Sequence, residues 1–224
     1  MRPSSYTRSE SCAASLLTLR SRSTPRSWLR SSVVPGVSDV SRYEVRIGGF
    51  GGQGVVTMAV VMGETLSLID NKYVVQTQSY GPEARGGASK SEVVISDEEI
   101  DYPKVQEPDV FIVLSRAAYL EYIDGLKEGG TLIVDEDLVQ VEGELPKNVK
   151  VYKIPATRIA DKEVGTKQAT NVVMLGAFAV ITKLLSTEGL KQRIEERWPR
   201  FVKTNMLALE LGMKAGKDAL ASTA

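Results

Sequence analysis

The chain has 224 residues, of which 42% are hydrophobic and 25% charged, as expected for a globular protein with a sizeable core. It contains no histidine and a single cysteine, Cys12. These counts exclude a disulfide framework, an iron–sulfur cluster held by this chain's own thiolates, and any nucleophile that is paired with histidine. No apolar run of about 18 residues or more occurs, which argues against a membrane-spanning helix.

The first 42 residues differ in composition from the rest of the chain. They carry twelve serines, seven arginines, two acidic residues and no lysine, whereas the remainder is acidic overall. We expect this 1–42 extension to be disordered, because it has too few apolar residues to offset the entropy of ordering. Its composition fits an organellar transit peptide, a basic nucleic-acid tail, or a start assigned too far upstream, with translation beginning near Val37 or Val40; we favour the last. The acidic body argues against nucleic-acid binding.

From Tyr43 the sequence alternates between short apolar runs and segments with helical periodicity. Residues 43–47 predict a strand, and residues 54–69 repeat apolar side chains about every 3.6 positions, as in a helix with one buried face. Residues 73–79 predict a second strand, which completes a βαβ unit. The further predicted strands cover 89–96, 110–114, 131–135 and 149–154, and the further helices cover 117–126, 171–185 and 190–214, the last broken or kinked at Pro199.

This alternation predicts one α/β domain over residues 43–215, followed by a C-terminal tail at 216–224. We expect a three-layer αβα architecture with a mostly parallel, Rossmann-like sheet and C-terminal helices. The sequence contains no internal repeat that would divide this domain further.

A glycine-rich segment, Gly48 to Gly54, lies between the first predicted strand and the first predicted helix. Gly49-Phe-Gly-Gly-Gln-Gly54 fits G-x-G-x-x-G in the strand–turn–helix context that this motif needs. The free N–H groups and the dipole at a helix start favour an anion, so the segment predicts a site for a phosphate-bearing ligand. The alternative is a tight turn packed by glycine alone, but five glycines in seven residues exceed what a turn requires.

Two common nucleotide ligands fit this segment badly. A P-loop requires lysine and then serine or threonine after its last glycine, where this chain has Val55-Val56. An NAD site adds an acidic residue at the end of the second strand, where this chain reads Gln78-Ser79. Asp70 lies near the right count but precedes the strand, so we assign it to a turn.

The second predicted strand leads into a loop in which glycine and proline surround Glu83 and Arg85. Loops that follow parallel strands meet at the carboxyl edge of the sheet, so this loop is expected beside the glycine-rich segment. Arg85 could bind phosphate or carboxylate through two parallel hydrogen bonds. Glu83 and Arg85 could instead pair with each other on a solvated loop, which would contribute little to stability.

Together the two motifs resemble a known family. Residues 51–57, Gly-Gly-Gln-Gly-Val-Val-Thr, followed by residues 79–87, Ser-Tyr-Gly-Pro-Glu-Ala-Arg-Gly-Gly, resemble the gamma subunit of 2-oxoacid:ferredoxin oxidoreductases. The resemblance covers roughly residues 43–215, and its second motif looks more like the 2-oxoglutarate or branched-chain ketoacid type than the pyruvate type. The binding residues that the resemblance and the two loops suggest are Gly49, Gly51, Gly52, Gln53, Gly54, Ser79, Tyr80, Glu83, Arg85, Gly86, Gly87 and Asn171.

The resemblance implies a multi-subunit cytoplasmic enzyme in which this chain alone is inactive. In this family a 2-oxoacid, coenzyme A and oxidised ferredoxin give acyl-CoA, carbon dioxide and reduced ferredoxin; 2-oxoglutarate would give succinyl-CoA. Alpha and beta subunits would hold thiamine diphosphate with magnesium, and a delta subunit would hold the iron–sulfur clusters. This chain would hold no metal and no catalytic residue, and would contribute to the coenzyme A site and the subunit interface.

Two other functions stay open. A free-standing NAD(P)-dependent dehydrogenase is indicated by G-x-G-x-x-G alone, and binding of NADH or NADPH would support it. The second alternative is a purely structural assembly subunit, in which the glycines only allow close packing against a partner. It would show no ligand at Gly49–Gly54.

Overall fold

The computed structural model describes residues 17–18, 42–80 and 87–223. Nearly all of the 1–42 extension therefore lies outside the described residues, as do Glu83, Arg85 and Gly86. The strands are β1 (Leu17–Thr18), β2 (Tyr43–Phe50), β3 (Tyr73–Tyr80), β4 (Ala88–Ser96), β5 (Val110–Val113), β6 (Thr131–Asp135) and β7 (Lys150–Ile154). The α-helices are α1 (Val55–Leu68), α2 (Arg116–Tyr122), α3 (Ala156–Ile159), α4 (Thr170–Thr182), α5 (Thr187–Arg197) and α6 (Val202–Thr223).

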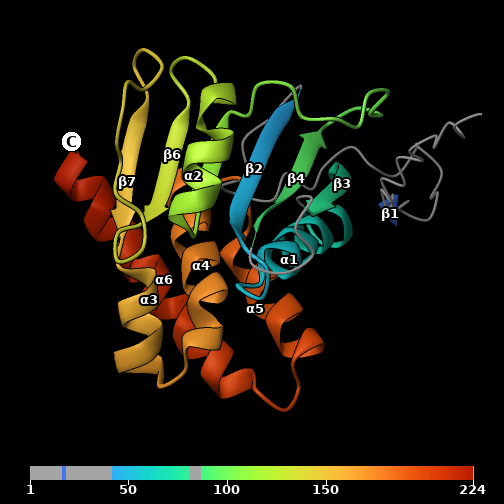
Figure 1. The fold of residues 1–224 in the computed structure, drawn as a ribbon. Coiled ribbons are helices and arrows are strands. Elements are labelled where there is room, and N and C mark those ends of the chain that lie inside the picture. The colour runs from blue at the N-terminus through green and yellow to red at the C-terminus, as the bar shows by residue number, and fades with distance from the viewer. Residues whose placement is uncertain (1–16, 19–41, 81–86, 224) are drawn as a thin grey trace, which may run out of the picture.

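The strands form one sheet in the order β1-β3-β4-β2-β5-β6-β7 (Figure 1). β2, β5, β6 and β7 pair in parallel, whereas β4 pairs antiparallel with both β2 and β3. β3 therefore runs in the same direction as β2, and the prediction of a mostly parallel α/β sheet is confirmed. β4 lies between β2 and β3, so the βαβ unit predicted from the sequence spans an intervening strand.

Two hydrophobic cores cover the two faces of this sheet. On one face, Ile47, Val93 and Ile112 pack against the helices α1, α4, α5 and α6. On the other face, Phe111 and Leu132 pack against the single helix α2. These layers form the αβα architecture that the alternating pattern predicts.

The C-terminal helices pack unusually closely on one another. α4 and α6 run parallel, since Val173 of α4 faces Gly212 and Ala177 faces Gly216 one turn later. α6 extends to Thr223, eight residues beyond the domain end expected at residue 215. The break predicted at Pro199 is confirmed, because α5 ends and α6 begins on either side of it. In the described ranges no helix has the length and apolar character needed to cross a membrane.

Two partly buried tyrosines make the fold sensitive to alkaline pH. Burial, followed by the charge of Asp109, raises the pKa of Tyr43 to about 12, and burial together with Glu121 raises the pKa of Tyr122 to about 12. The folded state disfavours tyrosinate at both positions. Their contribution to stability is therefore present below the unfolded pKa of about 10 and is lost as pH rises through the folded value.

We expect the free energy of unfolding to fall steeply between about pH 10 and pH 12. Denaturant unfolding across this interval measures the slope, and the Tyr43→Phe variant should show a shallower one. An identical slope in Tyr43→Phe would contradict the assignment of this titration to Tyr43.

Candidate functional site

The glycine motif lies at the carboxyl end of β2, at the edge of the sheet where ligands of open α/β folds bind. β2 continues to Phe50, so Gly48 and Gly49 are strand residues and the loop is shorter than the sequence suggested. Position 48 has no room for a side chain, because α2 crosses over the strand there. A Cβ at Gly48 would lie 3.0 Å from the Cβ of Ala118 and 3.1 Å from the ring of Phe111.

The loop itself is a tight turn followed directly by helix α1. The Gln53 N–H donates to the Phe50 carbonyl at 3.1 Å, which closes the turn. Gly52 has φ of 98° and Gly54 has φ of 76°, values that disfavour any side chain with a Cβ. Gly54 is also the N-cap of α1, and its carbonyl accepts the first intrahelical bond, from the Met58 N–H at 2.8 Å.

The side chain of Gln53 fixes this turn to the neighbouring strand. Its Oε1 accepts from the Phe50 N–H at 2.6 Å, and its Nε2 donates to the Leu114 carbonyl at 2.8 Å. A Cβ at Gly49 would lie 2.8 Å from that Oε1, so Gly49 makes room for the amide. Gln53, which the sequence suggested as a binding residue, therefore engages both of its amide atoms within the chain.

For most positions of the motif, the structure of the chain itself explains why the residue is glycine. Close contacts account for Gly48 and Gly49, and positive φ accounts for Gly52 and Gly54. Gly51 is different: its φ is not positive, and no described atom lies within 4 Å of a Cβ placed on it. The number of glycines is thus a weaker sign of a ligand than the sequence suggested, and Gly51 is the glycine of the motif that no contact or backbone angle of the described residues explains.

Asn171 lies directly behind the loop, in the first turn of α4. Only 7% of its surface is exposed, and its Nδ2 faces the Gly54 carbonyl at 3.5 Å. A Cβ at Gly54 would lie 2.4 Å from this nitrogen, so Asn171 and Gly54 fit only as a pair. The Oδ1 of Asn171 is buried and has no hydrogen-bond partner among the described residues. In native folds a buried acceptor of this kind usually accepts a hydrogen bond from an ordered water or a ligand.

The start of α1 is open to an anion. Gly54 supplies no side-chain cap, and the first turn of α1 contains no acidic residue. The leading N–H groups of an α-helix lack partners within the helix, and the helix dipole is positive there. Gly51 and Gly52 are both exposed, so no side chain of this loop covers its outer face.

The second motif leaves the sheet at the same edge. Phe50, the last residue of β2, pairs with Ala88, and Tyr80, the last residue of β3, pairs with Ser89. The first residues of β4 therefore lie between the end of β2 and the end of β3. The described site residues at this edge are Gly49, Gly51, Gly52, Gln53, Gly54 and Asn171 on the side of α1, and Ser79, Tyr80 and Gly87 across β4.

Asp70 is used at the far end of α1, as its assignment to a turn implies. Its Oδ2 accepts from the Ser186 N–H at 3.1 Å, at the residue that caps α5. Asp70 therefore holds the α4–α5 connection against the end of α1. It cannot serve as the ribose-binding acid of a dinucleotide site, because it lies one helix length from the glycine loop.

A buried carboxylate at the same edge was not predicted from the sequence. Asp135, at the end of β6, is fully buried and accepts from the Thr157 hydroxyl at 2.5 Å and from the Thr157 N–H at 3.4 Å. Burial raises its pKa, and the bonds from Thr157 oppose that shift. The contacts identify Asp135 as the anchor for the start of α3. Its partner Thr157 is 22 residues away in the sequence, so no local pattern could predict this role of Asp135.

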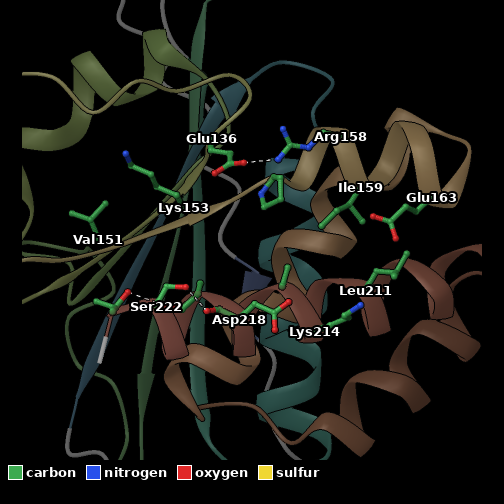
Figure 2. Close-up of a pocket in the computed structure, with 14 residues that line it drawn as sticks. Glu136, Val151, Lys153, Arg158, Ile159, Glu163, Leu211, Lys214, Asp218 and Ser222 are labelled. Atoms are coloured by element: carbon green, nitrogen blue, oxygen red, sulfur yellow. Dashed lines mark hydrogen bonds and ion pairs between the residues drawn. The ribbon is translucent and has the colours of Figure 1, made fainter.

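A groove in another part of the described structure lies away from this edge. It encloses about 560 Å³ between β7 and α6 (Figure 2). Lys153, Lys214 and Asp218 line it, and Arg158 crosses it to Glu136 at 2.6 Å. None of the site residues suggested by the motifs lines this groove, so it is separate from the glycine loop.

The described residues do not suit a metal or cluster. Among them, no three histidine, cysteine, aspartate or glutamate side chains come close enough to hold a metal ion. Cys12, the one cysteine of the chain, lies outside the described ranges. An iron–sulfur cluster, which needs several cysteine thiolates, therefore does not fit the donor groups of the described residues.

Comparison with known proteins identifies the family. The model of the pyruvate ferredoxin/flavodoxin oxidoreductase family matches residues 44–215. The 2-oxoglutarate synthase subunit KorC of Methanocaldococcus jannaschii is 49% identical over 178 residues, which cover 79% of this chain and 95% of that relative. KorC of Methanothermobacter marburgensis is 49% identical over 177 residues, covering 76% and 95%.

A solved structure also matches this chain in sequence and in fold. The gamma subunit of a keto/oxoacid ferredoxin oxidoreductase from Geobacter sulfurreducens is 40% identical and superposes with a TM-score of 0.72, over 80% of this chain and 99% of that one. The resemblance read from the two motifs is thereby confirmed. The chain belongs to the pyruvate ferredoxin/flavodoxin oxidoreductase family, as a gamma-type subunit.

Proposed function

We propose that this chain is the gamma subunit of a 2-oxoglutarate:ferredoxin oxidoreductase, which converts 2-oxoglutarate, coenzyme A and oxidised ferredoxin into succinyl-CoA, carbon dioxide and reduced ferredoxin. The KorC relatives, at 49% identity over nearly their whole length, support this choice among 2-oxoacids. Alpha, beta and delta subunits and ferredoxin are its partners, and we expect the complex in the cytoplasm.

We further propose that the outer face of the glycine loop forms one wall of the coenzyme A site. The observation that carries this role is Gly51, the one glycine of the motif that nothing inside the described chain explains. A phosphate at the uncapped start of α1 would receive backbone N–H groups and the positive end of the helix dipole. Ser79, Tyr80, Glu83, Arg85, Gly86 and Gly87 are proposed to approach the same ligand from across β4.

The chemistry of the reaction is assigned to the other subunits. Thiamine diphosphate, when bound there, would supply the carbanion that adds to the ketone of the 2-oxoacid and the ring that accepts the electron pair left when carbon dioxide departs. This chain's residues bind and orient coenzyme A, and they exclude water on one side of it. Asn171 and Gln53 act by holding the loop in the conformation that presents its N–H groups outward.

Purification of the native complex through a tag on this chain tests the proposed function. We expect thiamine- and cluster-bearing chains to copurify, and the complex to reduce ferredoxin only when both 2-oxoglutarate and coenzyme A are present. A chain that purifies alone, or a complex that prefers pyruvate to 2-oxoglutarate, would refute the proposal.

A further inference from the structure

β2 and β5 are parallel neighbours in the sheet, but their connections lead toward opposite edges of it. β2 leads through α1 toward β3 on one side, and β5 leads through α2 toward β6 on the other. Open α/β sheets bind their ligands in the crevice at such a switch in strand order. In this chain, the crevice between the ends of β2 and β5 is the natural place for a nucleotide.

That crevice is occupied by the side chain of Gln53. The amide bridges the Phe50 N–H of β2 and the Leu114 carbonyl just past β5, at 2.6 and 2.8 Å. The surrounding space is filled, since a Cβ at Gly49 would meet Oε1 of Gln53, Cγ2 of Val55 and Cβ of Leu114 within 3.2 Å. The side chain of Gln53 thus occupies the space and uses the Phe50 N–H and the Leu114 carbonyl that a ligand there would meet.

We propose that Gln53 is a positioning residue that closes the switch-point crevice and confines the coenzyme A phosphates to the outer face of the loop. The inference rests on the proposed function, which supplies the ligand. In this role Gln53 acts through the turn and not on the ligand, since each of its amide atoms makes a hydrogen bond inside the chain. It acts by holding the turn so that the exposed Gly51 and Gly52 face outward.

Two variants separate the volume of the side chain from its hydrogen bonds. Gln53→Met keeps the length of the side chain and removes both bonds. Gln53→Glu keeps the acceptor for the Phe50 N–H and sets a carboxylate oxygen against the Leu114 carbonyl, which is repulsive. Gln192→Met is the matched control, because the Gln192 amide is exposed and donates to the exposed Glu196 on the same helix, α5.

The experiment uses the whole complex and measures the KM for coenzyme A, the KM for 2-oxoglutarate and kcat. In Gln53→Met we expect the KM for coenzyme A to rise roughly 3- to 10-fold, as for the loss of one or two hydrogen bonds, and in Gln53→Glu to rise further. The KM for 2-oxoglutarate should stay constant, and Gln192→Met should match the wild type. Hydrogen exchange of residues 50–57 without ligand should be faster in Gln53→Met.

Hydrogen exchange of the wild-type complex with coenzyme A separates the two possible failures. Protection of residues 50–57 by coenzyme A is the expected result. Its absence would refute the coenzyme A role of the loop, and this inference with it. Protection in the wild type, combined with an unchanged KM for coenzyme A in Gln53→Met, would refute the role of Gln53 alone. An equal rise in both KM values would also refute it, because a general structural defect would explain that result.

Discussion

Replacing Gly212 by alanine should lower the free energy of unfolding by about 3 kcal/mol, near the upper end of typical overpacking effects. A Cβ at Gly212 would lie 2.0 Å from the Val173 carbonyl oxygen and 2.9 Å from the Val173 Cα. Both are backbone atoms of α4, so no side chain can rotate away. The helices must separate, and the core between them, which includes Val173 and Leu209, loses its packing.

Thermal and denaturant unfolding of the purified chain measure this effect. A loss of about 3 kcal/mol corresponds to a fall in Tm of roughly 6–12 °C for a chain of this size. Gly63→Ala is the matched control in helix α1, because a Cβ there would meet only Val74 Cγ1, at an ordinary 3.5 Å. That control should be neutral or stabilising by up to about 1 kcal/mol. Equal effects at Gly63 and Gly212 would contradict the close approach of α4 and α6.

Removing the carboxylate of Glu92 should cost about 3 kcal/mol or more, as expected when a buried charge loses its partner. Oε1 of Glu92 accepts from Arg46 Nε at 2.8 Å and from Lys90 Nζ at 3.2 Å. The side chains of Arg46 and Glu92 are only 9% and 11% exposed. Glu92→Ala would therefore leave a guanidinium buried on the sheet without its carboxylate.

Denaturant unfolding of Glu92→Ala should be compared with that of Glu142→Ala. Glu142 pairs with Arg116 at 3.0 Å, but the two side chains are 43% and 58% exposed, so its removal should change stability by less than about 1 kcal/mol. The double variant Arg46→Met with Glu92→Leu should recover most of the loss, because both charges are then absent. A double variant as unstable as Glu92→Ala would show that the ion pair is not the cause.

Most strands and helices of this fold could be predicted from periodicity, since each has its own local signal. The exceptions are β1, which lies in the segment expected to be disordered, and the short helix α3, neither of which was predicted. The place of β4 could not, because pairing such as Val45 with Val93 joins residues that no local pattern connects. The extension of β2 through Gly48 was also missed. Glycine disfavours strands locally, and the reason for it, contact with Ala118, is set by tertiary packing.

The place of the glycine motif in the fold could be predicted, but its contacts could not. The strand–turn–helix context of the glycine motif placed it correctly at the carboxyl edge of β2. The pairing of Gly54 with Asn171 spans 117 residues and came only through resemblance to relatives, not through residue chemistry. Counting glycines could not show that Gln53 is used inside the chain, because that depends on the carbonyl of Leu114 on a different strand.

The measurement that tests the central claim most directly is the KM for coenzyme A of the complex that carries Gly51→Ala. An added methyl group at Gly51 touches nothing in the described chain, so stability should stay within about 0.5 kcal/mol of the wild type. If coenzyme A lies against the outer face of the loop, its KM should rise about 10-fold or more, with the subunits still assembled. An unchanged KM in an intact complex, or a complex that no longer assembles, would contradict the claim that this loop is a wall of the coenzyme A site.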